Sequence, residues 1–464
     1  MNQKKRKFEV PHVYILLMAL ILLCGLLSYV VPAGQYDTVE ANGREIIDSA
    51  SFHTVESTPV NLMQLLTAIP RGMAESAQII FFIFIVGGAF GIIQQTGAIE
   101  AGIGSLIRKL KGKTLVILPV VLFLFSMGAS VFGMSEETIP FIPIFVSLCI
   151  AMGYDSITGM AIVACGSAAG YAGAFMNPFT LQVAQGIAEL PLLSGLEYRI
   201  VMFVVFFLVT AAFIMWYAGR VKKEPTKSPM YELDKVRDDV VDLENLKPFG
   251  IKEKAVLAVF VAAIGLLVYG VIAKGWYMDE ISALFLGMSI AVALVARMKP
   301  NEFARIFGAG MAEIATGALV VGFARGVLVV LTDGNILHTI LNAASSVLVQ
   351  LPSTASALGM YIFQCLLNFL VPSGSGQAAI SIPIMAPLGD LVGVTRQTAC
   401  IAFQIGDGLS NVLTPTSGTL MATLALAKIP WNKWAKWFLP LIGIQYLVGA
   451  VFVIVAHLIA LGPF

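Results

Sequence analysis

Long apolar stretches, separated by short polar segments, recur along the whole chain. A helix that crosses the hydrocarbon core of a bilayer needs about 20 mostly apolar residues. Nine stretches approach or exceed that length: residues 13–31, 77–96, 157–188, 199–218, 255–273, 281–296, 311–331, 395–427 and 437–460. The pattern predicts an all-α polytopic membrane protein with about nine spans.

Two further apolar stretches, residues 114–154 and 355–391, carry polar residues near their centres. If 114–154 were a single crossing, the nine Lys and Arg residues of the loop 220–254 would lie outside the cell. Basic loops prefer the cytoplasm. We therefore interpret both stretches as re-entrant hairpins, each of which enters and leaves the membrane on one side.

The first apolar run follows four basic residues, Lys4, Lys5, Arg6 and Lys7. We expect a retained span with its amino terminus in the cytoplasm and the protein in the cell membrane. A cleaved signal peptide is the alternative, because Pro32-Ala33-Gly34 is typical of a cleavage region. The run is longer than the apolar part of a usual signal peptide, which favours the span.

The two halves of the chain carry short matching motifs at a nearly constant offset of 237 to 240 residues. The matches pair Met73-Ala74-Glu75 with Met311-Ala312-Glu313, Pro143-Ile144 with Pro383-Ile384, Asn177-Pro178 with Thr414-Pro415, and Leu190-Pro191 with Ile429-Pro430. An odd number of crossings separates equivalent elements, so the second copy is inverted. The pattern predicts a first repeat over 1–218, a cytoplasmic linker over 219–252 and a second repeat over 253–464. Inverted repeats with discontinuous helices are typical of secondary transporters.

Composition supports a membrane protein and excludes several other classes. Apolar residues make up 58% of the 464 residues and charged residues only 12%, and mean hydropathy is +0.86. Because 29 Lys and Arg balance 28 Asp and Glu, no net charge attracts nucleic acid. The five cysteines lie in apolar runs without C-x-x-C spacing, and no H-E-x-x-H motif is present. We expect no cofactor, and a small-molecule substrate and the lipid bilayer as partners.

The interruptions of the apolar stretches are the candidate site. Backbone that is not helical inside a membrane must be buried in protein or line a wet cavity. Hydroxyls, carbonyls and carboxylates at such places bind small cations, and the amides at helix starts attract anions. The candidate residues are Ser135, Glu136, Glu137 and Thr138 in the first hairpin; Asn177 and Pro178 in the broken helix 157–188; Ser373, Gly374, Ser375, Gly376 and Gln377 in the second hairpin; and Asp407, Ser410, Asn411, Thr414, Pro415, Thr416 and Ser417 in the broken helix 395–427.

Each candidate also has a structural interpretation. Pro178 and Pro415 can simply kink their helices, and Glu136 and Glu137 would be solvated if the hairpin were two spans. Asp407 is the strongest single candidate, since a carboxylate in the middle of a span is costly and usually marks an ion or proton pathway. Arg325 can pair with Glu75 or Glu313 inside the scaffold, or it can contact the substrate.

Three segments carry a family resemblance: residues 132–138 (FGMSEET), 371–377 (VPSGSGQ) and 413–418 (LTPTSG). They resemble the YfcC-like branch of the DcuC four-carbon dicarboxylate carrier family, within the ion transporter superfamily. The resemblance implies a scaffold domain, a mobile transport domain with two hairpins, an elevator mechanism and a homodimer. It also implies coupling-ion sites where a hairpin tip meets a broken helix, with Na⁺ the superfamily's usual ion. A coupling proton or exchange stays open, because the Ser-Asn-Thr tip of the sodium-dicarboxylate members is absent.

The charges of the candidate residues guide the choice of substrate. Carboxylates and hydroxyls suit a cationic or zwitterionic substrate, and Arg396 is the nearest basic residue expected at the site. The YfcC-like branch is described as exchanging basic amino acids, whose positive charge is complementary to these carboxylates. We therefore expect a secondary transporter for a small amino acid, with a four-carbon dicarboxylate as the alternative. A channel or an intramembrane enzyme is a remote alternative, the latter because of Gly406-Asp407-Gly408, and we expect no enzyme.

Overall fold

The structure, a computed structural model, describes residues 13–41, 44–48, 50–98, 101, 116–177, 179–237, 250–274, 276 and 278–462. Helices dominate this part of the chain. Six of the described helices are long and apolar enough to cross a membrane: α3 (Ala77–Thr96), α9 (Leu196–Lys223), α12 (Met278–Val295), α13 (Pro300–Asp333), α15 (Ser353–Leu370) and α19 (Trp431–Leu458). The prediction of a mostly helical membrane protein is confirmed at this level, whereas the number of nine spans remains a prediction.

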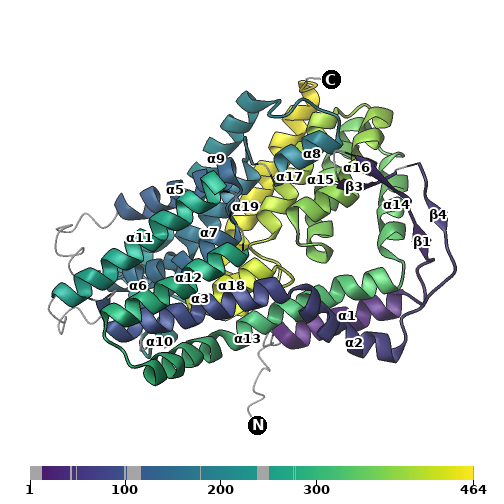
Figure 1. The fold of residues 1–464 in the computed structure, drawn as a ribbon. Helices are drawn as coiled ribbons and strands as arrows, with labels where there is room; N and C mark the ends of the chain where they lie inside the picture. Colours follow the sequence, from purple (N-terminus) through teal and green to yellow (C-terminus); the bar gives the residue numbers. More distant parts are fainter. Residues whose placement is uncertain are drawn as a thin grey trace, which may run out of the picture.

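One layer of the molecule is built on the long helix α13, which packs along α2 (Leu62–Glu75), α3 and α1 (Val13–Leu27). These helices run along the lower edge of Figure 1. Glycines let α2 and α13 touch backbone to backbone: a Cβ added to Gly72 would lie 2.4 Å from the carbonyl oxygen of Gly322. Helix α12 packs on α3, and α11 (Ile251–Lys274) packs on α12.

The first predicted hairpin corresponds to α5 (Ile117–Phe132), a 3₁₀ turn (Glu136–Phe141) and α6 (Ile142–Ala151). Helix α5 ends at Gly133, whose φ of 72° is left-handed and suits glycine. The second predicted hairpin corresponds to α15 and α16 (Gly374–Val392). Both stretches are therefore interrupted at their polar centres, and their interpretation as re-entrant hairpins remains a prediction.

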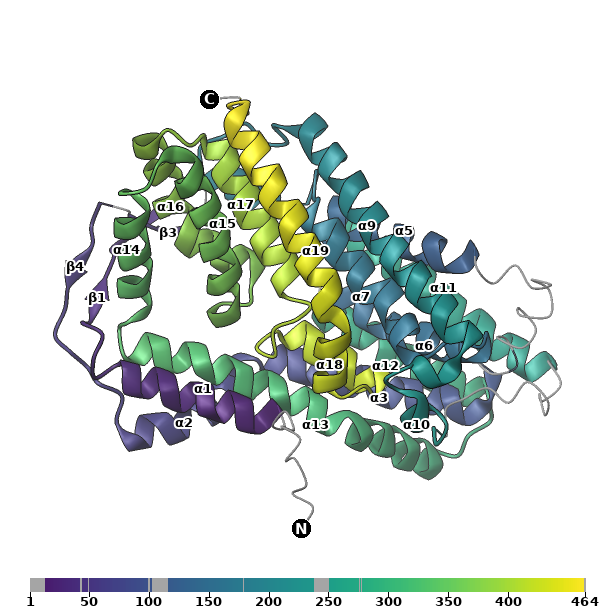
Figure 2. The same cartoon turned by 180° about the vertical axis from the view of Figure 1, so that it is seen from behind.

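The two predicted broken helices are each interrupted in the structure. Residues 157–188 form α7 (Ser156–Ala172) and α8 (Leu181–Ile187), and residues 395–427 form α17 (Arg396–Ser410) and α18 (Gly418–Ala427). Helix α7 packs on α5, α6 and α17, and α17 packs on α15 and α16, so hairpins and broken helices form one group. Helix α19 lies beside α9, α15 and α17, as Figure 2 shows.

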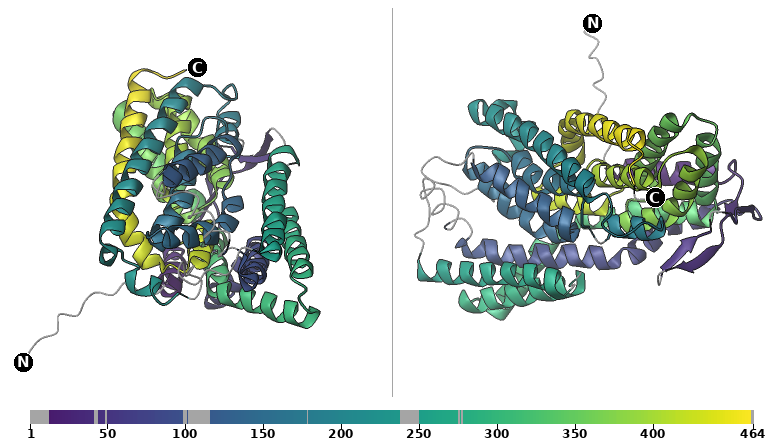
Figure 3. Two further views of the ribbon diagram at one scale, coloured as in Figure 1. Left: turned by 90° about the vertical axis from the view of Figure 1, so that its left-hand side faces the viewer. Right: turned by 90° about the horizontal axis from the view of Figure 1, so that it is seen from above.

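The described residues include four short strands that the all-α prediction did not contain. β1 (Gly34–Gln35) pairs antiparallel with β4 (His53–Thr54), and β2 (Thr38–Ala41) pairs with β3 (Arg44–Ile47). Their segment is polar and lacks a helical period, so its backbone pairs between neighbouring short strands instead. The strands lie next to α14 (Leu337–Leu348), at the end of the molecule far from α11 and α12 (Figure 3).

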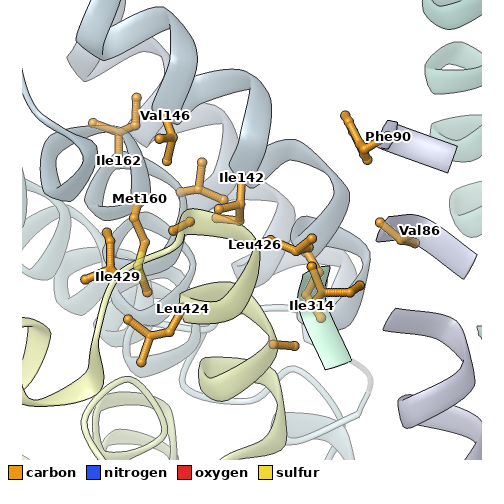
Figure 4. Close-up of a cluster of buried hydrophobic side chains, with 14 of the residues drawn as sticks. Val86, Phe90, Ile142, Val146, Met160, Ile162, Ile314, Leu424, Leu426 and Ile429 are labelled. Atoms are coloured by element: carbon orange, nitrogen blue, oxygen red, sulfur yellow. The ribbon is translucent and has the colours of Figure 1, made fainter. Parts of the chain in front are cut away.

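Buried apolar side chains join the α13 layer to the group of hairpins and broken helices. Figure 4 shows part of this core, in which α3 and α13 meet α6, α7 and α18. Its labelled members are Val86, Phe90, Ile142, Val146, Met160, Ile162, Ile314, Leu424, Leu426 and Ile429. This packing sets the positions of the polar segments described next.

Candidate functional site

A cavity of about 520 Å³ lies where the two groups of helices meet. Its wall includes the tips of both hairpins, the two helix interruptions, the start of α3 and one face of α13. The structure brings these predicted site residues to the wall: Ser135, Glu136, Glu137, Thr138, Ser373, Gly374, Ser375, Asp407, Asn411, Thr416 and Ser417. The cavity is large enough for a small metabolite.

The first hairpin tip presents two adjacent carboxylates. The amide of Ser135 donates a hydrogen bond to Glu137 Oε2 at 2.8 Å, and Thr138 Oγ1 donates to the Ser135 carbonyl at 2.6 Å. These bonds satisfy backbone groups that the 3₁₀ turn leaves free. Glu136 instead reaches across the cavity wall, where its Oε1 accepts a hydrogen bond from Thr419 Oγ1 at 2.9 Å.

The second hairpin tip begins a helix that faces Asp407. Ser373 caps α16 by accepting a hydrogen bond from the Gly376 amide at 3.4 Å. A Cβ added to Gly374 would lie 2.4 Å from Thr180 Cγ2 and 3.1 Å from Asp407 Oδ2. Glycine is therefore needed at 374 for the start of α16 to approach both helix interruptions.

Asp407 is 1% exposed and is held by two side-chain amides. Its Oδ1 accepts hydrogen bonds from Asn368 Nδ2 and Asn411 Nδ2, both at 3.0 Å. Asn368 was not predicted, although an amide side chain inside the apolar run of α15, which also holds Gln364, was a signal. A buried carboxylate is retained in such surroundings only when donors satisfy it or when it binds a proton or cation.

Several predicted site residues lie away from the cavity wall. Asn177 stabilises the first helix interruption: its Oδ1 accepts from the amides of Phe179 and Thr180, and its Nδ2 donates to the Ala129 carbonyl. Pro178 lies outside the described residues.

In the second half, Gln377 turns toward α15, where its Nε2 donates to Gln364 Oε1 at 2.8 Å and its Oε1 accepts from Asn368. Ser410 shares a hydrogen bond with the hydroxyl of Tyr446 at 2.9 Å. The buried Thr414 hydroxyl has no partner among the described residues. These residues shape the helix ends behind the wall, as do Gly376 and Pro415.

Other wall residues were missed by sequence reasoning. Tyr171 on α7 donates to the Gly133 carbonyl at 2.5 Å and so fixes the end of α5. Thr419, Thr180 and Ser76 also line the cavity. Each is a single polar residue in an apolar helix or at a helix end, and no spacing rule indicates which residue it meets.

Arg325 is the basic residue on the described cavity wall. Its Nε donates to Glu75 Oε2 at 2.8 Å, and both side chains are 41% exposed. The expectation that Arg396 lies nearest the site is wrong. Arg396 pairs with Glu189 at 2.7 Å and Asp390 at 2.8 Å, at the far end of α17, because the helix start there places it beside the ends of α8 and α16.

The described residues contain no group of three or more His, Cys, Asp or Glu that could hold a metal ion. A coupling Na⁺ at the hairpin tips therefore rests on hydroxyl and carbonyl oxygens beside single carboxylates, and it remains a prediction. In the second half, the wall residues with that chemistry include Ser373, Asp407 and Thr416.

Comparison with known proteins places the chain among membrane carriers. The family model for DcuC, the C4-dicarboxylate anaerobic carrier, matches residues 10–458. The "Putative basic amino acid antiporter YfcC" of Escherichia coli (strain K12) is 36% identical, over 98% of this chain and 98% of that protein. An uncharacterized protein of Haemophilus influenzae is 28% identical over the same shares.

Two solved transporter structures resemble the chain only distantly. The Alcanivorax borkumensis YdaH transporter has 17% identity and a TM-score of 0.43, over 98% of this chain and 100% of that one. Neisseria gonorrhoeae MtrF has 18% identity and a TM-score of 0.44, over 97% and 95%. At these TM-scores the resemblance is too distant to transfer an architecture.

Proposed function

The chain belongs to the C4-dicarboxylate anaerobic carrier family, and from this premise we propose that it transports a small amino acid and that its first candidate substrates are basic amino acids. Membership in this family makes it a multi-pass membrane transporter. The choice of amino acid over dicarboxylate rests on one observation, the distribution of charge around the cavity. The name of the Escherichia coli relative agrees with that choice.

Three carboxylates face the cavity from the hairpins and broken helices: Glu136, Glu137 and Asp407. On the α13 side the wall has Arg325, already paired with Glu75. A dicarboxylate would meet three acidic groups and one neutralised cation. A basic amino acid offers two ammonium or guanidinium groups for the carboxylates and one carboxylate for the arginine. Complementary charge therefore favours the amino acid.

Arg325 is suited to receive the carboxylate of the substrate. Guanidinium groups bind carboxylates through paired hydrogen bonds, and α13 holds Arg325 on a rigid crossing with α2 through Gly72 and Gly322. In this proposal Glu75 neutralises Arg325 while the site is empty, and the substrate carboxylate takes over part of that role. The exposure of both side chains leaves room for the exchange.

The transport cycle is proposed to follow an elevator mechanism. In support, both hairpins and both broken helices pack together as one group, while α13 and α3 supply the opposite wall. Movement of that group along α13 would carry the site across the membrane. The proposal further includes inverted repeats over 1–218 and 253–464 and a homodimer. It places the protein in the cell membrane with its amino terminus in the cytoplasm, and it couples transport to Na⁺, to a proton or to exchange.

The test is uptake by purified protein in liposomes, with arginine, ornithine, agmatine and succinate compared under imposed proton and sodium gradients. Saturable arginine or ornithine uptake, stimulated by the same amino acid inside, supports the proposal. Agmatine resembles arginine without the carboxylate, so discrimination against it supports recognition by Arg325. Succinate uptake without amino acid uptake would overturn the proposal and favour anion binding at the amides that begin α16. Non-saturable flux would indicate a channel.

A further inference from the structure

A second pocket, of about 540 Å³, lies at the carboxyl end of α9. None of its lining residues also lines the transport cavity. Its lining includes Trp216, Arg220, Lys223, Glu224 and Lys227. Helix α9 is one of the six helices able to span a membrane, so its last turn lies near the boundary between hydrocarbon and water. The pocket therefore sits where lipid headgroups are.

The charges of this pocket are only partly balanced. Lys227 pairs with Glu224 at 2.5 Å. In the described part of the chain, Arg220 and Lys223 form no ion pair of their own, although Arg220 is close enough to help lower the pKa of the Glu224 carboxyl that Lys227 already pairs. The Arg220 guanidinium lies over the Trp216 ring, 5.7 Å from its centre, which holds the cation at the pocket without neutralising it. Two positive charges thus remain available to an anion.

An exposed apolar row leads from the membrane interior to these charges. Leu208, Ala212 and Trp216 precede Arg220 at four-residue steps, and because each step turns the helix only slightly, this row stays within about a third of the helix circumference. The exposed fractions of Leu208 and Trp216 are 56% and 57%. From Leu208 to Arg220 the helix rises about 18 Å, comparable to one leaflet of a hydrocarbon core about 30 Å thick.

We propose that this face of α9 binds a phospholipid with an anionic headgroup. The phosphate would be held by Arg220 and Lys223, and an acyl chain would lie along Trp216, Ala212 and Leu208. The tryptophan at the junction matches the preference of Trp for the headgroup level of a membrane. Basic pockets at the ends of membrane helices are known to select anionic headgroups. A free phosphate ion would use the same cations but would gain nothing from the apolar row.

The site has a structural consequence for α9. This helix packs against α5, α7 and α19, and it therefore contacts the group that carries the transport cavity. A lipid that binds the folded protein shifts its unfolding to higher temperature in proportion to occupancy. Stability of the intact protein is thus a direct measure of binding, without reference to transport or to the proposed substrate.

The test is thermal unfolding of the full chain in mild detergent, titrated separately with phosphatidylglycerol, phosphatidylcholine of the same acyl chains and inorganic phosphate. We expect the melting temperature to rise with phosphatidylglycerol alone. In the double variant R220Q/K223Q the lipid concentration for half the shift should rise roughly tenfold or more. The variant K299Q/R305Q, which removes two exposed charges at the start of α13, is the matched control and should behave like the parent.

Three outcomes would overturn the proposal. Equal shifts with phosphatidylcholine would show that any lipid suffices, and an equal shift with phosphate would assign the pocket to a free anion. A parent-like titration of R220Q/K223Q would show that headgroups bind elsewhere. If that variant fails to fold, the single variants R220Q and K223Q, together with native mass spectrometry of retained lipid in the parent, decide between the same outcomes.

Discussion

Thr419 Oγ1 donates a hydrogen bond to Glu136 Oε1 at 2.9 Å, joining residues that are 283 positions apart in the chain. Glu136 belongs to the first hairpin tip, and Thr419 lies in the first turn of α18 beyond the second helix interruption. The bond ties the two halves of the chain together on the cavity wall. It also fixes one of the three carboxylates on which the proposed selectivity depends.

We expect the substitution Thr419→Val to change transport more than stability. Valine keeps the shape of threonine but cannot donate to Glu136, so the carboxylate loses its orientation. The apparent affinity for a cationic substrate should fall several-fold, while the free energy of unfolding falls by about 1 kcal/mol. Thr423→Val is the control, since Thr423 also lines the cavity but donates within its own helix. Equal effects of both variants would contradict the assigned role of Thr419.

Replacing Asp407 by Asn should leave the fold intact and impair uptake or its coupling. The neutral side chain is nearly isosteric and its oxygen can still accept from Asn368 and Asn411, but it cannot hold a proton or balance a cation. Initial rates in liposomes should fall at least about tenfold, with little change in melting temperature. Asp279→Asn, at an exposed position that begins α12, should match the parent. Unchanged uptake by D407N would remove Asp407 from the site.

Asn177→Ala should act on stability first. The substitution leaves the amides of Phe179 and Thr180 and the carbonyl of Ala129 without their partner. Each buried backbone group left unsatisfied costs about 1–3 kcal/mol, so melting temperature and yield should both fall. Gln182→Ala, which removes an exposed bond to Met176, is the control. A stable variant with weakened substrate affinity would instead support the direct binding role predicted from sequence.

The substitution Arg325→Gln should abolish discrimination between arginine and agmatine. Without the guanidinium, the carboxylate of arginine has no cation on the wall, so its apparent affinity should fall roughly tenfold or more toward that of agmatine. Glu75→Gln should have the opposite effect on anions, because it leaves Arg325 unpaired. Competition of each compound against labelled ornithine measures both effects. Persistent discrimination in R325Q would restrict Arg325 to a scaffold ion pair.

The contact between the strand segment and α14 should weaken in acid. The amide of Tyr36 donates to His338 Nδ1 at 3.1 Å, and burial lowers the pKa of His338 below its usual value near 6.5. Because the folded state favours the neutral ring, the stabilisation is complete above about pH 6.5 and declines as pH falls through the folded pKa. His338→Asn keeps an acceptor that does not titrate.

Melting temperatures of the parent and H338N, measured from about pH 8 to about pH 5, test this prediction. The parent should lose stability relative to H338N as the solution becomes more acidic. His53→Asn, at an exposed position on β4, should track the parent at every pH. A difference between parent and H338N that does not vary with pH would show that the ring stays neutral throughout.

The positions of the helix interruptions could be predicted because polar residues inside long apolar stretches are rare and costly. Ser135 to Thr138, Ser373 to Ser375 and Asp407 all stand out in this way, and all lie on the cavity wall. The same signal predicts where the chain leaves regular structure. It does not predict which side chains then hydrogen-bond to backbone groups and which face the cavity.

That second distinction depends on contacts between distant segments. Asn177 and Gln377 carry the same amide group, and both turn away from the cavity, Asn177 toward the backbone of Ala129 and Gln377 toward α15. Asn368, Tyr171 and Thr419 were missed because each, like Asn177, meets a residue at least 38 positions away. No local spacing encodes those meetings. The short strands were missed because two to four residues are too few for a period to appear.

The cavity wall also sets an order for the synthesis of the protein. Its last elements, Thr416 to Thr423, are translated after most of the chain, yet they face Glu136 and Val321, which are made much earlier. Until α18 enters, Glu136 lacks its partner and Gly418 has not closed against Val321. A chain that ends before α18 thus leaves Glu136 without Thr419, so the hydrogen bond that joins the two halves at the site can form only after most of the chain has been synthesised.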